Sequence, residues 1–220
     1  IKLAANAARD PLAGTLRLGI FPTLAPYLLP LLMPSLRQQF PNITILLVEE
    51  KTPELIRQLE AGALDCALLA LPVVGEGLSS THLFREPFLL AVARNHHLAS
   101  RKSVRVGNLT QENVLLLEDG HCLRDQALEV CHRVGAGHQT DNFRATSLET
   151  LRHMVAASDA VTLMPKLACR DDDPSTRYIP FATPVPARDI GLIWRKTSGR
   201  TALFTAIGDL VRAVCKDVGA

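Results

Sequence analysis

The sequence predicts an α/β fold arranged as two lobes, each built on a sheet of parallel strands. Short apolar runs alternate with helical segments of about ten residues between residues 15 and 71, and the same alternation returns between residues 114 and 164. Such alternation favours parallel sheets with right-handed crossover helices. With 220 residues, 47% of them hydrophobic, the chain is large enough to bury a substantial core.

The first half contains three expected strands, at residues 16–20, 43–48 and 65–71, and two expected helices, at residues 27–39 and 53–61. Pro30 and Pro34 fall inside the first of these helices. A proline inside a helix removes a hydrogen bond and clashes with the preceding turn. We therefore expect this helix to begin late or to be kinked.

A turn-rich stretch at residues 72–80 leads into the second half. Strands are expected at residues 82–85, 88–93, 114–117, 143–145, 161–164 and 190–194. Helices are expected at residues 122–134, 148–157 and 202–214. Residues 171–174, three aspartates and a proline, are expected to form a surface loop.

Composition limits the partners and the compartment. A net charge of +2 makes a nucleic-acid-coating surface on this segment unexpected. No apolar run reaches the roughly 18 residues of a membrane span and no leader opens the chain, so we expect a cytoplasmic protein without a membrane partner. Five cysteines without framework spacing indicate reduced thiols. Because the first residue is Ile1 rather than methionine, we expect a fragment whose N-terminal part has been removed.

Cys122 is the candidate for chemistry. An apolar run at 114–117 is followed by a turn with Gly120 and then by a periodic segment, so this thiol is expected at a helix N-terminus. The positive end of the helix, His121 and Arg124 favour its thiolate. Three acidic neighbours act in the opposite direction: Glu118, Asp119 and Asp125. Our hypothesis is that the positive groups prevail.

Cys131 follows on the same predicted helix. Nine residues of helix correspond to an axial rise of about 13.5 Å and about half a turn, so the two thiols would point to opposite sides. A disulfide needs Cα atoms about 4.4–6.8 Å apart, so Cys122 and Cys131 can bond only if the helix unwinds. The residues alone leave open whether Cys131 packs the core or reacts with Cys122. The remaining cysteines carry no motif and are expected to be packing residues: Cys66, Cys169 and Cys215.

A metal site is the competing interpretation of this segment. His121, Cys122, Cys131 and His132 are all residues that can bind a metal. However, one ion cannot be reached from opposite faces of a single helix, and the sequence contains no CxxC pair. We therefore expect no metal here, and no cofactor.

Residues 117–126, with the sequence LEDGHCLRDQ, and the following Cys131 resemble the sensor segment of the peroxide-sensing OxyR family of LysR-type transcription regulators. Residues 14–87 resemble the first half of a LysR-type effector domain. Residues 143–151 and 162–165 resemble its second half. The resemblance covers nearly the whole chain from Gly14 onward.

This resemblance implies the periplasmic-binding-protein type II architecture, in which two Rossmann-like lobes joined by two crossing strands enclose a cleft. Lobe I would comprise residues 14–88 and 193–220, and lobe II, with the redox cysteines, residues 89–192. Residues 1–13 would be the tail of a linker helix. The winged helix-turn-helix through which such proteins bind DNA would be absent from this chain. The domain would form a homodimer, and the full-length protein a tetramer.

The resemblance also implies roles for the two cysteines. Cys122 would be the peroxidatic residue, which attacks hydrogen peroxide as a thiolate and becomes a sulfenic acid. Cys131 would be the resolving residue that forms the disulfide. Closing so short a loop restrains the unfolded chain by only about 2.5 kcal/mol. The lost helix packing could cost as much, so we expect a strained disulfide that a glutaredoxin- or thioredoxin-type reductant reduces readily.

Six further residues would form the peroxide pocket: Thr23, Thr52, His121, Arg124, Asp125 and Arg188. The two threonines follow the first two strands, and in OxyR proteins threonines at the matching positions hydrogen-bond peroxide or the water that replaces it. As isolated residues they are also typical helix caps, and one hydroxyl can serve both roles. His121 and Asp125 would form hydrogen bonds around the reactive site. Arg188 would stabilise the thiolate or the departing hydroxide.

The implied function is the redox-sensing regulatory domain of an OxyR-like transcription regulator, not an enzyme. Disulfide formation would refold the sensor, change the dimer contacts and so alter DNA binding. Two alternatives remain. A LysR-type domain that binds a small organic ligand in the cleft would need neither Cys122 nor Cys131, and a thiol peroxidase would consume many equivalents of peroxide with a reductant.

Overall fold

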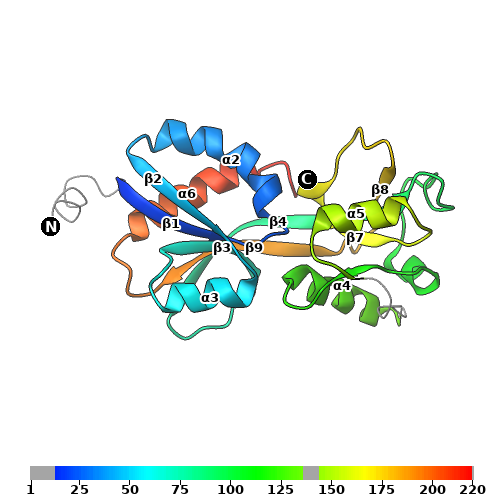
Figure 1. Ribbon diagram of the computed structural model, residues 1–220, viewed down its shortest axis with the longest axis horizontal. Coiled ribbons are helices and arrows are strands. Elements are labelled where there is room, and N and C mark those ends of the chain that lie inside the picture. The colour runs from blue at the N-terminus through cyan, green and yellow to red at the C-terminus, as the bar shows by residue number, and fades with distance from the viewer. Residues whose placement is uncertain (1–12, 136–143, 220) are drawn as a thin grey trace. The chain divides into compact units, whose positions relative to one another are not determined.

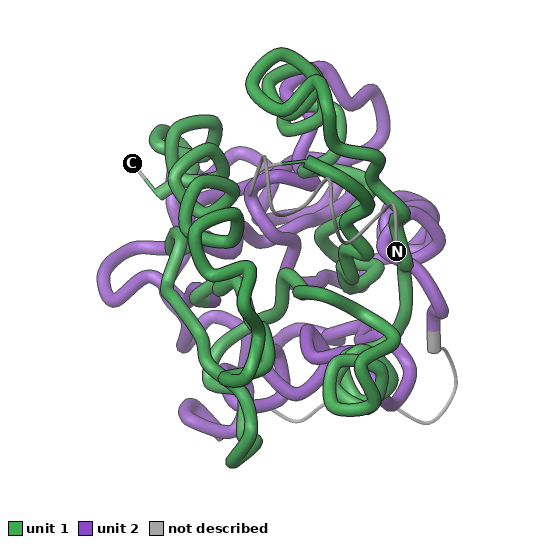
Figure 2. Tube along the Cα trace, turned by 90° about the vertical axis from the view of Figure 1, so that its left-hand side faces the viewer, with its two compact units in different colours: residues 1–85, 189–220 green, residues 86–188 purple. Residues whose placement is uncertain are grey.

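The computed structural model describes residues 13–135 and 144–219, which form two compact units. Unit 1 contains the described residues up to Arg85 and those from Asp189 onward, and unit 2 contains Glu86–Arg188. Figure 2 shows each unit in its own colour. The strands β4 (Leu78–Ala93) and β9 (Ala187–Arg195) contribute residues to both units. The expected linker-helix tail lies, apart from Ala13, outside the described residues.

The sheet of unit 1 is built around β1 (Gly14–Ile20). On one side β1 pairs in parallel with β2 (Ile43–Glu49) along its whole length, and on the other it pairs in parallel with β3 (Cys66–Leu71). The next strand, β9, runs antiparallel to β3. In the register of β1 and β2, the last residues Ile20 and Glu49 lie opposite each other, so both strands end at the same edge of the sheet. These parallel strands confirm the predicted α/β class.

Three helices cover this sheet. Helices α2 (Ala25–Gln39) and α6 (Thr201–Val214) contact each other and lie on one side of the strands, whereas α3 (Thr52–Glu60) lies on the other side (Figure 1). Helices on both faces are what right-handed crossovers produce around a parallel sheet. None of the helices in the described part of the chain is long and apolar enough to cross a membrane.

Helix α2 corrects one expectation. It begins at Ala25, two residues earlier than expected, and continues through Pro30 and Pro34. Pro26 occupies its first turn, where the missing N–H has no partner to lose. The side chains of every fourth residue in its apolar stripe are buried: Leu28, Leu32 and Leu36. Burial of this continuous stripe compensates for the hydrogen bonds that the interior prolines remove.

Unit 2 contains a larger antiparallel sheet and a much smaller parallel one. In the larger sheet, β4 pairs with β7 (Thr162–Pro165) and with β8 (Thr176–Pro180). In the smaller one, β5 (Leu116–Leu117) pairs with β6 (Arg144–Ala145), two residues on each side. The first residue of the strand expected at 143–145 lies outside the described residues.

The structure differs from the predicted strands in two places. The separate strands expected at 82–85 and 88–93 are one strand, β4, because Pro87 fits extended backbone and the pairing with β7 begins only at Phe88. The strand β8 was not predicted at all.

The helices of unit 2 are α4 (Cys122–Arg133) and α5 (Leu148–Ala156), with short 3₁₀ turns η1 (Val106–Gln111) and η2 (Lys166–Ala168). Both α-helices match the predicted segments to within one residue. Helix α4 contacts β5 and η1, and α5 contacts both sheets.

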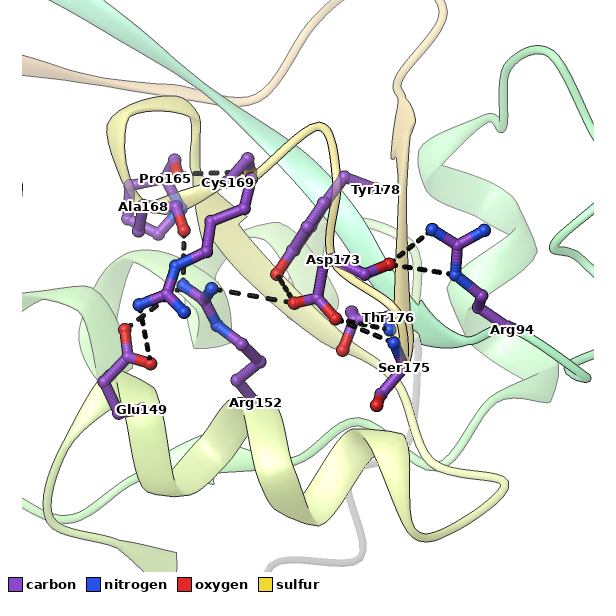
Figure 3. Close-up of polar contacts among 11 residues, drawn as sticks. Arg94, Glu149, Arg152, Pro165, Ala168, Cys169, Asp173, Ser175, Thr176 and Tyr178 are labelled. Atoms are coloured by element: carbon purple, nitrogen blue, oxygen red, sulfur yellow. Dashed lines mark hydrogen bonds and ion pairs between the residues drawn. The ribbon is translucent and has the colours of Figure 1, made fainter.

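Figure 3 shows a polar cluster that joins α5 to β8. The carboxylate of Asp173 accepts hydrogen bonds from the amides of Ser175 and Thr176 and from the hydroxyl of Tyr178, each at 2.9 Å. Nη1 of Arg152, on α5, lies 3.7 Å from the same carboxylate. Burial alone would raise the pKa of Asp173, but these hydrogen bonds and the arginine charge lower it. Asp173 is only 7% exposed, so the expected surface loop is wrong for this residue.

Candidate functional site

Cys122 is the first residue of α4 and is partly exposed. Gly120 has a φ of 88°, a left-handed conformation that glycine adopts without strain, and this lets the chain turn sharply from β5 into the helix. His121 occupies the N-cap position and is buried. The structure therefore confirms that this thiol lies at the positive end of a helix dipole.

The turn before α4 is held by Arg124. Its Nε donates to Oδ1 of Asp119 at 2.8 Å, and its Nη1 donates to the carbonyl oxygen of Leu117 at 3.1 Å. On the other side of the turn, Nε2 of His121 lies 3.9 Å from Oε1 of Glu118. Arg124 and His121, expected to favour the thiolate, thus lie beside Asp119 and Glu118, which are expected to oppose it.

Asp125 differs from these neighbours. Its side chain is exposed in the first turn of α4, and it makes no side-chain hydrogen bond with another residue of the described part of the chain.

Cys131 lies in the last turn of the same helix and is 0% exposed. Because α4 is continuous over 12 residues, nine residues of helix separate the two cysteines, an axial rise of about 13.5 Å. Burial raises the pKa of the Cys131 thiol, which therefore stays protonated in this conformation. None of the chain's five cysteines, all of which are described, forms a disulfide. The geometry confirms that Cys122 and Cys131 cannot bond while α4 is intact.

The other three cysteines lie in packed surroundings: Cys66, Cys169 and Cys215. Burial raises the pKa of Cys66, and it raises that of Cys169 to about 12. The Cys169 thiol donates to the carbonyl oxygen of Pro165 at 3.4 Å. The raised pKa values of Cys66 and Cys169 favour the neutral thiol, which is consistent with packing.

Thr23 and Thr52 lie in unit 1, each three residues beyond the end of a strand, β1 or β2. Because these strands end opposite each other, both threonines lie at the same edge of the sheet. Neither is an N-cap, since Leu24 and Lys51 occupy those positions in α2 and α3, so the helix-cap interpretation was wrong. Oγ1 of Thr52 is buried and has no hydrogen-bond partner among the described residues. A buried hydroxyl in this state is available to a small ligand.

Arg188 is buried in unit 2 and pairs with Glu86, a residue that the sequence analysis missed. Nε and Nη2 of Arg188 lie 2.8 and 2.7 Å from Oε2 of Glu86, and both side chains are 0% exposed. Oε1 of Glu86 accepts the amide of Leu167 at 2.9 Å. The only sequence signal was a glutamate between Arg85 and Pro87, next to the apolar run at residues 88–93.

Comparisons with known proteins agree on one family. The family model described as the LysR substrate binding domain matches residues 9–216. The DNA-binding transcriptional dual regulator OxyR of Escherichia coli K12 is 43% identical over 216 residues, which are 97% of this chain and 70% of that protein. The hydrogen peroxide-inducible genes activator of Haemophilus influenzae is 41% identical over 99% of this chain and 72% of its own length.

Solved structures give the same result. The reduced form of OxyR superposes with a TM-score of 0.86 at 40% identity, covering 94% of this chain and 98% of that one. The oxidised form gives 0.85 at 42% identity, covering 94% and 99%. A hydrogen peroxide-bound mutant of Corynebacterium glutamicum OxyR gives 0.89 at 31% identity, covering 97% and 68%. This chain therefore belongs to the LysR family of transcription regulators and, within it, to the OxyR type.

Proposed function

We propose that this chain is the peroxide-sensing regulatory part of an OxyR-type transcription regulator, and that Cys122 and Cys131 are its redox pair. One observation carries the proposal: the two cysteines lie at opposite ends of one continuous helix, with Cys122 partly exposed and Cys131 buried. Relatives named as hydrogen peroxide-inducible activators, and the existence of both reduced and oxidised OxyR structures, support it.

The reaction consumes one peroxide and two thiols. The Cys122 thiolate attacks one peroxide oxygen, the O–O bond breaks, and the departing hydroxide takes up a proton to become water, which leaves a sulfenic acid. The Cys131 thiol then attacks the sulfenic sulfur. The S–S bond forms, the S–OH bond breaks, and the hydroxyl leaves with a proton as a second water. The two cysteines lose two electrons, and the peroxide gains them.

The second step couples chemistry to conformation. Disulfide geometry requires Cα atoms about 4.4–6.8 Å apart, whereas the intact helix separates the two residues by about 13.5 Å along its axis. Helix α4 must therefore unwind, and Cys131 must leave its buried position. Apolar side chains on the same helix face lose their packing with it: Leu123, Ala127 and Val130. We propose that this refolding changes the contacts of a homodimer and thereby DNA binding.

The remaining site residues assist the first step. We propose that the hydroxyls of Thr23 and Thr52 hydrogen-bond peroxide, for which the unpartnered Oγ1 of Thr52 is the supporting observation. His121 and Arg188 would stabilise charge on the thiolate or the departing hydroxide. Arg124 positions the turn that carries Cys122, through its bonds to Asp119 and Leu117.

The test is oxidation with one equivalent of hydrogen peroxide, followed by intact-mass measurement and thiol counting. The wild-type chain should lose two thiols and two hydrogen atoms. Cys131→Ser should stop at a sulfenic acid that dimedone traps, and Cys122→Ser should not react. Cys169→Ser is the matched control and should behave as wild type. A Cys122→Ser variant that oxidises at the wild-type rate would refute the assignment.

The number of peroxide molecules consumed per protein distinguishes a thiol peroxidase from a sensor. With a thioredoxin- or glutaredoxin-type reductant present in excess, a sensor should be reset but should consume peroxide slowly. Consumption of many peroxide equivalents at the rate of the first oxidation would identify an enzyme instead. We propose that such a reductant resets the disulfide in the cytoplasm.

A further inference from the structure

Three potential metal-binding side chains meet in unit 2, in residues that the redox chemistry does not use. His96 and His97 lie in the turn after β4, and Glu112 follows directly after η1. Nε2 of His97 lies 3.1 Å from Oε1 of Glu112, and Nε2 of His96 lies 3.5 Å from Oε2. One ligand atom from each residue lies within 4.8 Å of the other two. We propose that these three residues bind a divalent transition metal ion of the zinc and nickel class.

The spacing suits a small ion. Zinc binds imidazole nitrogen and carboxylate oxygen at about 2.0–2.2 Å, so neighbouring ligands in a tetrahedral site are about 3.3 Å apart. The two nitrogen–oxygen distances, 3.1 Å to Oε1 and 3.5 Å to Oε2 of Glu112, lie on either side of that value. The His97 side chain is 67% exposed, so it can rotate to complete the site without disturbing the core. Two imidazoles and one carboxylate occupy three coordination positions of a tetrahedral ion, and the fourth position would face solvent.

The two imidazoles and one carboxylate determine which metal ions the site would prefer. Imidazole nitrogen favours zinc, nickel, copper and iron, whereas calcium and magnesium prefer sites made only of oxygen. Glu112 is 6% exposed and His96 is 2% exposed, so the pair is already removed from water. A buried carboxylate needs a positive or hydrogen-bonding partner, which a bound cation supplies in full.

The His96 ring provides a signature of binding. Its Nδ1 accepts the backbone amide of Leu98 at 3.2 Å, so the neutral ring carries its proton on Nε2, facing Glu112. A metal ion at Nε2 requires the proton to sit on Nδ1 instead. Metal binding and the Leu98 hydrogen bond therefore exclude each other, and the amide of Leu98 should be released when the ion binds.

Calorimetric titration with Ni²⁺, repeated with Zn²⁺, tests the site on the reduced chain. His97→Ala removes one ligand from an exposed position and should weaken binding at least tenfold. His153→Ala, an exposed histidine on α5 outside the cluster, is the matched control and should bind within twofold of wild type. Equal affinity in wild type and His97→Ala, or no saturable binding in wild type, would overturn the proposal.

Hydrogen exchange gives the second readout. Addition of Ni²⁺ should speed exchange at the Leu98 amide in the wild-type chain and leave it unchanged in His97→Ala. An unchanged Leu98 amide in the metal-saturated wild type would contradict ligation through Nε2 of His96. Neither measurement uses peroxide or requires a disulfide, so neither outcome depends on the proposed peroxide function.

Discussion

Two regions of unit 2 are attached to the rest of the fold very differently. The Asp173 carboxylate accepts three hydrogen bonds from Ser175, Thr176 and Tyr178, in and just before β8, and Arg152 of α5 lies 3.7 Å from it. Helix α4, by contrast, follows a strand of two residues, and its first turn is held largely by Arg124. Under the proposed mechanism, unit 2 combines a fixed part, the Asp173 cluster, with a helix, α4, that disulfide formation releases. We propose that α4 refolds while α5 and β8 stay in place.

Removing the Asp173 carboxylate should produce the largest change in the free energy of unfolding. Asp173→Ala removes the acceptor of three hydrogen bonds and the carboxylate beside Nη1 of the buried Arg152, which keeps its ion pair with Glu149. We therefore expect a loss of about 3 kcal/mol in the free energy of unfolding. Denaturant unfolding measures this loss. The rate of peroxide oxidation at Cys122 should stay within twofold of wild type. A loss below about 1 kcal/mol would show that the cluster does not anchor the unit.

Weakening helix α4 should have a smaller effect on stability, and it should change the rate of disulfide formation specifically. Ala127→Gly lies inside α4 and should cost about 1 kcal/mol. In the proposed mechanism the helix unwinds before Cys131 reacts, so conversion of sulfenic acid to disulfide should accelerate by up to about fivefold. Rapid quenching followed by intact-mass measurement gives the rate of this step.

The control for this variant is Ala206→Gly, inside α6 of unit 1. It should cost a similar free energy of unfolding and leave the rate of disulfide formation unchanged. Equal acceleration by both substitutions would mean that general destabilisation, and not the opening of α4, controls the rate.

The smallest expected effect is a pH dependence of the stability that the Asp173 carboxylate contributes. The pKa of Asp173 is lowered in the folded chain, so the ionised carboxylate stabilises the fold at pH values above the ordinary carboxyl pKa, about 3.9. This contribution is lost as the pH falls through the lower folded-state pKa. The difference in unfolding free energy between wild type and Asp173→Asn should therefore be constant near neutral pH and shrink below about pH 4. A difference independent of pH would exclude this role.

Local patterns in the sequence predicted the structural features that depend on residues close together in the chain. Helix α4 was expected at 122–134 and occupies Cys122–Arg133, because apolar periodicity and the glycine turn are local signals. The placement of both cysteines on it followed directly. Whether Cys131 is exposed depends on the packing of α4 against the rest of the unit, which no local pattern contains.

Features made by distant residues could not be predicted. The pair of Glu86 and Arg188 joins residues 102 positions apart, and β8 pairs with a strand more than 80 residues earlier in the chain. Strand formation depends on such partners more than on intrinsic preference. The burial of Asp173 follows from the same pairing, which turns a sequence typical of a solvated loop into an anchored turn.

Hydrogen exchange along α4, compared between the reduced chain and the chain bearing the Cys122–Cys131 disulfide, tests the central claim most directly. We predict that the amides of α4 lose their protection in the oxidised form while those of α5 keep theirs. If the disulfide forms and α4 remains as protected as in the reduced form, bond formation does not require the helix to unwind, and the account of signalling is wrong.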